Sequence, residues 1–321
     1  MEIKRIITDL GDDWSGYRNI MVSTLFNGNP LITSINNYLT GNSGKQLRPM
    51  LALLAGGACG KRNETVLHCA AVSEMIHTAT LMHDDVTDNG NIRRGKPTVK
   101  ALFTSSAAVL CGDYWLARAL YLLSSKCSPQ ILECFTTAVE HLAEGEMIQM
   151  NLADTLQMTE EKYYDIISKK TSSLFIAAAR GAAIAVNPPQ EYIDAITRYA
   201  LYLGQAFQIR DDIFDYSPSL QTGKAAGADI KERKITLPLI YAIKESTAEE
   251  SAGIMKKIAD QSSDVAESAI DFVTRHNGIA AAQEKLAEKA ALAKESIAPL
   301  PDSIEKRHLL DIAEYLCTRT S

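Results

Sequence analysis

The residues in this sequence best suited to chemistry are two clusters of aspartate. DDVTD occupies residues 84–88 and DDIFD occupies residues 211–215, so both clusters share the pattern DDxxD. On a helix, residues three or four positions apart lie on one face, and each cluster therefore brings three carboxylates together. Like charges at that spacing repel one another. We interpret the clusters as oxygen ligands for a hard cation, and Mg²⁺ is the natural candidate.

Both clusters come at the predicted C-terminal ends of helices. Asn89-Gly90 follows the first cluster and Ser217-Pro218 follows the second, and both dipeptides favour the end of a helix. The C-terminal end is the negative pole of a helix, where a carboxylate is least favourable. A sequence that accepts this arrangement twice indicates that the carboxylates serve a function.

Basic residues lie on either side of the first cluster. Arg93-Arg94 and Lys96 follow it, and Lys45 and Arg48 come just before a predicted helix. Arginine suits phosphate because its planar fork makes bidentate hydrogen bonds and its charge does not titrate away. Taken alone, the basic segment would be interpreted as a solvated turn, but beside the carboxylates it favours an anion site.

His77 lies seven residues before Asp84, close to the same helical face. A single histidine on an apolar helix is more often a core residue, yet here we favour ligand binding because the residue points toward the charged groups. Two acidic clusters and separate basic groups predict two anionic ligands, which we interpret as two diphosphates. One would be held through metal and the other through Lys, Arg and His.

Composition limits the classes of function. The chain has 321 residues, 46% hydrophobic and 22% charged, which is ordinary for a globular protein. A net charge of −6 argues against binding to nucleic acid. The six cysteines form no CxxC pair, so we expect reduced core residues of a cytoplasmic protein. The N-terminus lacks the apolar stretch of a signal peptide, and the apolar run 174–186 is too short to span a membrane.

The dominant periodicity is that of α-helix, and alternation typical of strands is almost absent. We therefore predict an all-α single domain of roughly ten or more helices. The predicted helices cover residues 17–40, 47–58, 64–85, 100–124, 128–151, 159–185, 189–217, 235–245, 248–275, 279–298 and 302–318.

One long irregular stretch, residues 217–233, follows the second cluster and contains Lys224, Lys231 and Arg233. Loops of this length are uncommon unless they act as lids or binding loops. A basic flap over an anionic ligand is the functional interpretation, and a surface loop without function is the alternative.

An ordered set of motifs resembles a known family. The set is similar to that of trans-isoprenyl diphosphate synthases of the long-chain, octaprenyl type, and it runs over residues 44–238 in the family's order. Each motif is short, but the ordered set is specific. The motifs are GKQLRP (44–49), DDVTD with RRG (84–95), GDY (112–114), EGE (144–146), KT (170–171), GQAFQIRDDIFD (204–215) and KITLP (234–238).

The resemblance implies an isoprenoid-synthase helical bundle around a deep central cavity, formed by residues 1–321 as one domain. It implies Mg²⁺-dependent, head-to-tail condensation of isopentenyl diphosphate with an allylic diphosphate, either farnesyl or geranyl diphosphate. The expected product is an all-trans polyprenyl diphosphate, such as the precursor of a quinone side chain. Three Mg²⁺ ions per active site are implied when the allylic diphosphate is bound.

The resemblance also implies a role for each matching residue. Asp84, Asp88 and Asp211 would ligate the Mg²⁺ ions, and Asp85, Asp212 and Asp215 would support them. The allylic diphosphate would be contacted by Arg93, Lys170, Lys224 and Lys234, and isopentenyl diphosphate by Lys45, Arg48, His77 and Arg94. Thr171 and Gln208 would present oxygens near the developing allylic cation, so that Lys170, Thr171 and Gln208 are the catalytic candidates.

The implied reaction needs no Ser/His/Asp triad. Metal and lysines stabilise the departing diphosphate, the allylic C–O bond ionises, and the alkene of isopentenyl diphosphate attacks the cation. The proton would then pass to the departed diphosphate. Asn89, Arg210 and Ile235 depart from common family residues, but none of them removes a ligand.

Product length is predicted from two small residues before the first cluster. Thr80 lies one turn below Asp84, and Ala79 is beside it. In the resembled family, bulky aromatics here close the tunnel and shorten the product. We expect an open tunnel and about seven to nine isoprene units by family analogy. The alternative is that both are ordinary packing residues. The tunnel floor could involve Leu123, Met147 or Met150.

Other functions stay open at this point. A short-chain farnesyl or geranylgeranyl diphosphate synthase is the first alternative. A terpene cyclase on the same scaffold usually lacks the second set of basic residues, and a non-catalytic partner subunit would lack cluster carboxylates. The family further implies a homodimer, in which the helices predicted at 100–124 and 128–151 could pack across a two-fold axis. At most, a peripheral contact with a membrane is expected.

Overall fold

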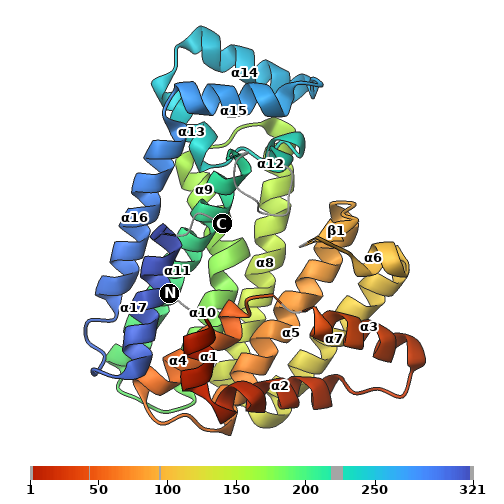
Figure 1. Cartoon of the computed structure of the whole chain (residues 1–321), viewed down its shortest axis with the longest axis vertical. Helices are drawn as coiled ribbons and strands as arrows, with labels where there is room; N and C mark the ends of the chain where they lie inside the picture. The colour runs from red at the N-terminus through yellow and green to blue at the C-terminus, as the bar shows by residue number, and fades with distance from the viewer. Residues whose placement is uncertain (1–2, 43, 94, 218–226, 319–321) are drawn as a thin grey trace. The chain divides into compact units, whose positions relative to one another are not determined.

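The computed structural model describes residues 3–42, 44–93, 95–217 and 227–318. These residues are mostly helical, and the sheet found among them has two very short strands (Figure 1). The prediction of an all-α fold is confirmed. The elements are α1 (Ile3–Leu10), α2 (Asp12–Leu25), α3 (Pro30–Gly41), α4 (Leu47–Cys59), α5 (Glu64–Thr87), β1 (Ile92–Arg93), β2 (Lys96–Pro97), α6 (Val99–Leu102), α7 (Ser105–Lys126), α8 (Pro129–Thr155), α9 (Glu160–Ile167), the π-helix η1 (Ser168–Ser172), α10 (Ser173–Ile184), α11 (Gln190–Asp215), α12 (Ala228–Lys231), α13 (Leu237–Glu245), α14 (Ala248–Asp260), α15 (Val265–Arg275), α16 (Gly278–Ser296) and α17 (Ile304–Thr318).

Three helices that apolar periodicity predicted as continuous are each broken. The segment 100–124 is interrupted between α6 and α7, where the Thr104 side chain accepts from the Ala107 N–H at 3.0 Å. The segment 17–40 is interrupted between α2 and α3, where the Asn29 side chain accepts from the Leu31 N–H at 2.9 Å and Pro30 begins the next helix. The segment 248–275 is interrupted after α14, where Gln261 takes the left-handed conformation with φ 50°. In all three places, local capping signals outweigh the apolar pattern.

The irregular stretch 217–233 was predicted as one loop, and part of that prediction is wrong. Residues 218–226 lie outside the described residues, but Ala228–Lys231 forms the short helix α12. Its first N–H groups are bonded by a carboxylate from α11, so a contact distant in sequence creates this helix. The short helix α1, at residues 3–10, was not predicted either.

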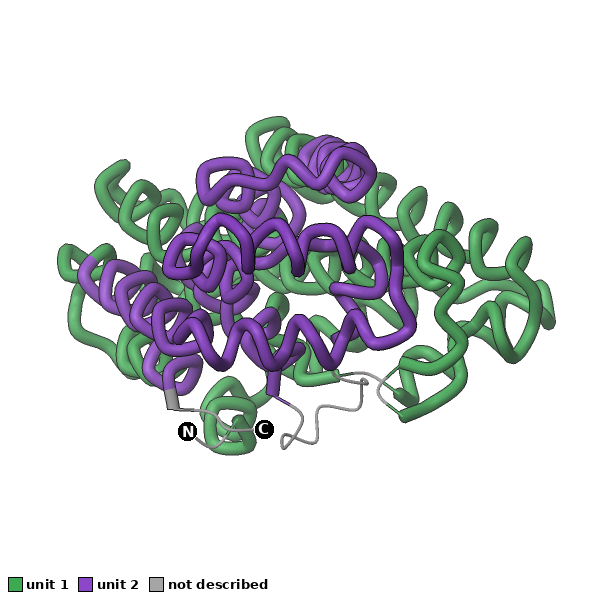
Figure 2. The backbone as a smooth tube through the Cα atoms, turned by 90° about the horizontal axis from the view of Figure 1, so that it is seen from above, with its two compact units in different colours: residues 1–139, 174–200, 296–312 green, residues 140–173, 201–295, 313–321 purple. Residues whose placement is uncertain are grey.

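The chain divides into two compact units, shown in Figure 2. Unit 1 comprises residues 1–139, 174–200 and 296–312, and unit 2 comprises residues 140–173, 201–295 and 313–321. The boundaries fall inside α8, α10, α11, α16 and α17, so the units do not correspond to consecutive pieces of sequence. That residues 1–321 form one domain stays a prediction.

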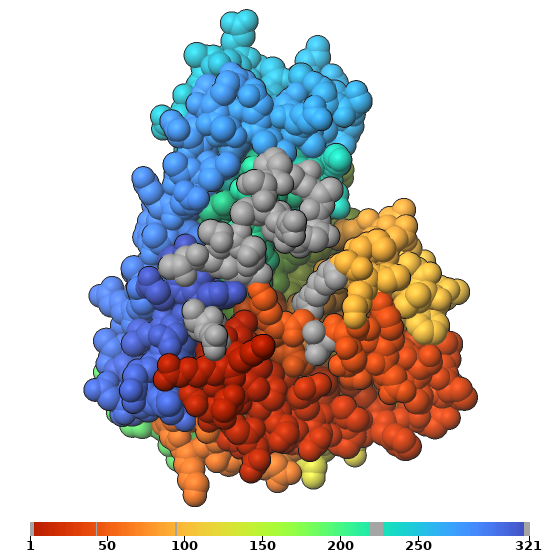
Figure 3. Space-filling view, viewed as in Figure 1, coloured from red at the N-terminus to blue at the C-terminus, as the bar shows by residue number. Residues whose placement is uncertain are grey.

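Unit 1 is organised around α5, which packs against α2, α4 and α7. From Val66 to Ile76, nearly every α5 side chain is buried, as predicted for a helix in the middle of a bundle. Asn63 begins α5 by accepting a hydrogen bond from the Val66 N–H at 3.1 Å. On the face seen in Figure 3, the N-terminal helices (red to orange) and the segment around α6 (yellow) form the surface of this unit.

Unit 2 places α15 against α12, α13 and α14. The start of α16 lies very close to α13, because a Cβ added to Gly278 would be 2.2 Å from the Pro238 carbonyl oxygen. In the described parts of both units, no helix is long and apolar enough to cross a membrane.

Candidate active site

The first Asp cluster forms the end of α5 in unit 1. Asp84 and Asp85 belong to the helix, and the Asp88 N–H closes it by donating to the Asp84 carbonyl at 2.9 Å. Asn89 then turns left-handed with φ 54°, and this ends the helix where the sequence predicted. Asp88 is exposed, whereas Asp84 is half-buried.

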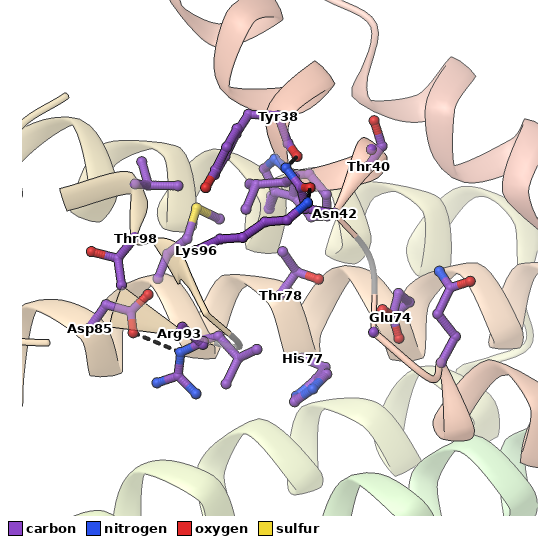
Figure 4. Close-up of a pocket in the computed structure, with 18 of the residues that line it drawn as sticks. Tyr38, Thr40, Asn42, Glu74, His77, Thr78, Asp85, Arg93, Lys96 and Thr98 are labelled. Atoms are coloured by element: carbon purple, nitrogen blue, oxygen red, sulfur yellow. Dashed lines mark hydrogen bonds and ion pairs between the residues drawn. The ribbon is translucent and has the colours of Figure 1, made fainter. Parts of the chain in front are cut away.

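Asp85 differs from the other two carboxylates. It is buried, and it accepts a hydrogen bond from Arg93 Nε at 2.7 Å (Figure 4). Burial raises the pKa of Asp85, and the Arg93 cation opposes that rise. The repulsion expected within the cluster is therefore offset at Asp85 by a cation from outside the cluster, Arg93.

A two-stranded hairpin positions Arg93. Strand β1 pairs antiparallel with β2, with Arg93 opposite Lys96, and Gly95 makes the turn with φ 72°. Tyr38 of α3 donates to the Pro97 carbonyl at 2.6 Å and ties the hairpin to α3. Arg94, predicted to bind isopentenyl diphosphate, lies outside the described residues.

A cavity of about 310 Å³ lies beside the Asp85–Arg93 pair. His77, Asp85 and Arg93 all line it, as Figure 4 shows, so the structure gathers three of the predicted site residues of unit 1. Lys96 lines it too and is bonded to Asn42. The cavity therefore combines cationic groups with a carboxylate, as an anion site next to a metal site requires.

The N-terminal end of α4 supplies two further predicted cations. Lys45 is exposed just before this helix, and Arg48 lies in its first turn with its guanidinium 4.7 Å from the centroid of the Phe175 ring. Gln46 caps α4 in a left-handed conformation, and it lines the same cavity as His77. A helix N-terminus favours anions because its unpaired N–H groups carry partial positive charge.

The two predicted chain-length residues lie on α5 with different surroundings. Ala79 is 1% exposed, whereas Thr80 is half-buried. The Thr80 hydroxyl donates to the His77 carbonyl at 2.9 Å, so its polar atom is satisfied by its own helix.

The second Asp cluster ends α11 in unit 2, and its three carboxylates have three different environments. Asp211 is the exposed member, and it accepts from Arg210 Nη2 at 3.1 Å. Arg210 is buried, with its guanidinium 4.9 Å from the Phe207 ring centroid and 5.6 Å from that of Phe214. Arg210, one of the three residues that depart from the family pattern, thus provides a cation beside Asp211.

Asp212 is buried within a hydrogen-bonded chain. Thr171 donates to Gln208 Oε1 at 2.7 Å, and Gln208 donates to Asp212 Oδ1 at 2.8 Å. Tyr163 donates to Asp212 Oδ2 at 2.6 Å. Burial raises the pKa of Asp212, and the nearby Asp229 adds to the rise. The structure therefore connects both predicted catalytic oxygens, those of Thr171 and Gln208, to the second cluster.

Asp215 caps a helix. Its two oxygens accept from the N–H groups of Ala228 at 3.0 Å and Asp229 at 3.1 Å, at the start of α12. These bonds fix the chain after residues 218–226. Predicted as a supporting metal ligand, Asp215 holds backbone in this structure, so Asp211 is the carboxylate of this cluster that faces solvent.

A π-helical turn presents Lys170 and Thr171. The segment η1 interrupts the α-helical run between α9 and α10, and such turns occur frequently at functional sites. Lys170 forms an ion pair with Glu146 and donates to Gln149 Oε1 at 2.5 Å. Glycines admit this turn, because a Cβ on Gly204 would lie 2.6 Å from Ser172 Cα.

Of the two remaining predicted lysines, Lys234 is described and Lys224 is not. Lys234 follows Arg233, which has φ 58°, and forms an ion pair with Glu232. Lys224 lies outside the described residues, so its predicted contact with the allylic diphosphate has no structural counterpart here.

Sequence reasoning missed several polar residues of the site. Glu74 is a buried acid that lines the cavity with His77, and an acid within an apolar helix was the available signal. Tyr163 and Gln149 gave no such signal, because their bonds to Asp212 and Lys170 join residues far apart in sequence.

A comparison with models of known protein families decides which family this chain belongs to. A family model described as polyprenyl synthetase matches residues 29–273. The chain belongs to the polyprenyl synthetase family. The predicted family and the prediction of a prenyltransferase are therefore confirmed.

Individual proteins and a solved structure match this chain over nearly its whole length. The chain is 37% identical to an all-trans-nonaprenyl-diphosphate synthase (geranyl-diphosphate specific) of Rhodobacter capsulatus, covering 90% of this chain and 89% of that protein. It is 34% identical to octaprenyl diphosphate synthase of Escherichia coli, covering 99% of both. A crystal structure of polyprenyl synthase from Caulobacter crescentus, complexed with calcium and isoprenyl diphosphate, matches with a TM-score of 0.93 and 30% identity, covering 100% of this chain and 98% of that one.

Proposed function

We propose that this protein is a long-chain trans-polyprenyl diphosphate synthase, which condenses isopentenyl diphosphate with an allylic diphosphate. The observation that carries the proposal is the cavity of unit 1, where His77 and Arg93 lie beside the carboxylates that end α5. The relatives named as nonaprenyl and octaprenyl diphosphate synthases support the long product.

The clusters fit Mg²⁺ by their chemistry. In the part of the chain that the structure describes, no three His, Cys, Asp or Glu side chains gather closely enough to hold a metal by themselves. Mg²⁺ is commonly held by one or two carboxylates, with water and substrate phosphates completing its shell, and Asp84, Asp88 and Asp211 supply such oxygens. Bound there, Mg²⁺ would neutralise negative charge on the allylic diphosphate. The calcium in the related crystal structure is consistent with a divalent ion.

The chain's own residues divide the remaining work. Arg93, Lys170 and Lys234 hold the allylic diphosphate and stabilise it as the C–O bond ionises. Lys45, Arg48 and His77 bind isopentenyl diphosphate, whose alkene attacks the cation. Thr171 and Gln208 present oxygens to the cation, and their fixed hydrogen bonds keep those oxygens from reorienting. Lys224 and Arg94 keep the roles that the family pattern gives them.

Product length is set on α5 below the first cluster. Ala79 and Thr80 are small, and the Thr80 hydroxyl is bonded to its own helix, so neither residue offers an aromatic ring or an unpaired hydroxyl to an isoprenoid tail. Of the three residues considered for the tunnel floor, Leu123 is fully buried, whereas Met147 and Met150 are 71% and 60% exposed. Leu123 is therefore the one we retain.

The protein acts as a homodimer. On α7, Leu110 is 67% exposed and Tyr121 is 59% exposed, and large apolar side chains on one helix favour a protein contact. Sedimentation of the purified protein at micromolar concentration should give twice the mass of one chain. A monomer that is fully active would contradict the dimer and leave the reaction intact.

The deciding experiment is incorporation of labelled isopentenyl diphosphate onto geranyl or farnesyl diphosphate with Mg²⁺, followed by chromatography of the products. We expect octaprenyl diphosphate or a neighbour in length. Products of farnesyl or geranylgeranyl length would establish the short-chain alternative. Absence of any condensation would contradict the proposal and favour a non-catalytic subunit.

A further inference from the structure

The Gly112-Asp113-Tyr114 motif of α7 has no part in the proposed reaction, yet it lies against the last turn of α5. A Cβ added to Gly112 would lie 2.4 Å from His83 Nε2 and 2.7 Å from His83 Cδ2. The imidazole ring of His83 therefore rests directly on the backbone of α7, and only glycine leaves it room. His83 is the residue immediately before Asp84.

Two acceptors of α7 hold the same nitrogen of that ring. His83 Nε2 lies 3.2 Å from Asp113 Oδ1 and 3.3 Å from the Val109 carbonyl oxygen. An ionised carboxylate and a carbonyl can only accept, so Nε2 carries the proton in either charge state of the ring. The contact therefore fixes the ring's orientation and, in the neutral form, its tautomer.

The α7 side of this contact is anchored as well. The Tyr114 hydroxyl donates to the Leu25 carbonyl at 3.3 Å and accepts from Asn27 Nδ2 at 3.4 Å. The third residue of the motif thus ties α7 to the segment between α2 and α3. His83 rests on a part of α7 that is itself held in place.

The end of α5 needs such a support. The last turn of a helix lacks onward hydrogen bonds for its carbonyl groups and tends to fray. Here, that turn carries Asp84 and Asp88, and it is closed by the bonds from Asp88 N to Asp84 O and from Gly90 N to Asp85 O, both 2.9 Å. A side chain fixed one residue before Asp84 restrains the direction of the Asp84 and Asp88 carboxylates.

We propose that His83, seated on Gly112 and hydrogen-bonded to the Val109 carbonyl beside Asp113, is a positioning residue that fixes the last turn of α5 and thereby strengthens divalent-metal binding by Asp84 and Asp88. The proposal rests on the metal-binding role proposed for the first cluster. Groups that orient a metal site commonly change metal affinity by about 10–100-fold when they are lost.

The first measurement needs no metal. Hydrogen–deuterium exchange of the Asp88 and Gly90 amides is compared in wild type, His83→Ala and His83→Gln. We expect faster exchange in His83→Ala and recovery in His83→Gln, because a glutamine amide can donate from nearly the same position as Nε2. Unchanged exchange in His83→Ala would overturn the proposal whatever the metal site does.

The second measurement is the affinity for Mn²⁺ in the presence of an allylic thiodiphosphate that cannot ionise. Binding is monitored by the electron paramagnetic resonance signal of Mn²⁺. We expect about ten-fold weaker binding in His83→Ala and in Gly112→Ala, with His83→Gln close to wild type. A matched control is the histidine–carboxylate pair of unit 2, in which His276 Nε2 lies 3.6 Å from Glu250 Oε1. The variant His276→Gln should bind Mn²⁺ as wild type does.

Thermal unfolding distinguishes a positioning role of His83 in metal binding from a contact that only stabilises the fold. His83→Ala with a lowered melting temperature and wild-type Mn²⁺ affinity would show a structural contact only and would overturn the proposal. A wild-type protein that binds no Mn²⁺ would instead contradict the proposed function of the cluster, while amide exchange would still decide whether His83 fixes the turn.

Discussion

The two DDxxD clusters have the same spacing and come at the same end of a helix, yet their carboxylates are supported differently. In unit 1, Asp85 is balanced by the Arg93 cation from a hairpin. In unit 2, Asp212 is balanced by neutral donors, and Asp215 by backbone N–H groups. A motif therefore fixes which residues are present, while the surrounding elements decide which carboxylates stay available to a ligand.

The largest expected effect tests whether one proposed metal ligand from each cluster makes the same contribution to the rate. Asp84→Asn and Asp211→Asn should each lower kcat for condensation by about 10³-fold, the scale of losing a strong electrostatic contact to the transition state. Their melting temperatures should change little, because both side chains reach solvent. Asp154→Asn, an exposed acid of α8, is the control with wild-type activity. Near-normal kcat in either cluster variant would show that the clusters are not equivalent.

A second comparison concerns stability. Asp212→Ala removes the acceptor of the buried Tyr163 hydroxyl, so the free energy of unfolding should fall by about 3 kcal/mol. Asp85→Ala leaves Arg93, whose side chain is 32% exposed and can be solvated, so the loss should be about 1 kcal/mol. Urea denaturation of both variants measures the difference. Equal losses would mean that the two supports do not differ in the way the hydrogen bonds indicate.

The pH dependence of stability should reveal the buried carboxyl of the second cluster. Because burial raises the pKa of Asp212, folding favours its protonated form. The stability that the protonated Asp212 carboxyl contributes is fully present below about pH 3.9, the pKa of Asp in the unfolded chain. This stability is lost as pH rises through the pKa of Asp212 in the folded protein. Relative to Asp212→Asn, metal-free wild type should therefore lose stability as pH rises above about 4. Asp154→Asn should follow wild type at every pH, and parallel curves for Asp212→Asn would refute the assignment.

A glycine substitution tests the turn that serves the second cluster. Gly204→Ala places a Cβ 2.6 Å from Ser172 Cα, so the unfolding free energy should fall by about 1–3 kcal/mol and Thr171 should shift away from Gln208. Gly253→Ala in α14 has open space around it and should instead gain about 0.5–1 kcal/mol. Activity retained in Gly204→Ala would show that the π-helical turn tolerates displacement.

Substitutions at the two chain-length residues of α5 should have the smallest effect on the rate of condensation and a large effect on the length of the product. Ala79→Tyr and Thr80→Tyr should shorten the product while condensation proceeds at a rate within a few-fold of wild type, because they block the tail and leave the diphosphate contacts intact. Ala252→Tyr, at an exposed position of α14, should leave product length unchanged. Chromatography of the products measures all three variants, and an unchanged distribution in both α5 variants would remove the chain-length role.

Much of the fold followed from local signals. Apolar periodicity predicted the long helices, and Asn63 and Asn89 marked the two ends of α5 where the structure has them. The breaks at Asn29-Pro30, Thr104 and Gln261 were missed because the apolar pattern resumes beyond each of them. Helix α12 could not be predicted, because its first N–H groups depend on Asp215, which lies thirteen residues away from Ala228.

The family, the helical class and the positions of the charged residues could all be predicted from the amino-acid sequence, because motif order and periodicity do not depend on packing. Only the tertiary structure decided that Asp85 meets Arg93, that Asp212 is buried under Tyr163, that Asp215 caps α12 and that His83 rests on Gly112. Each of these depends on which atoms approach within hydrogen-bonding or van der Waals distance after packing. Spacing along a helix gives the face on which a side chain begins, but not the partner that it finds there.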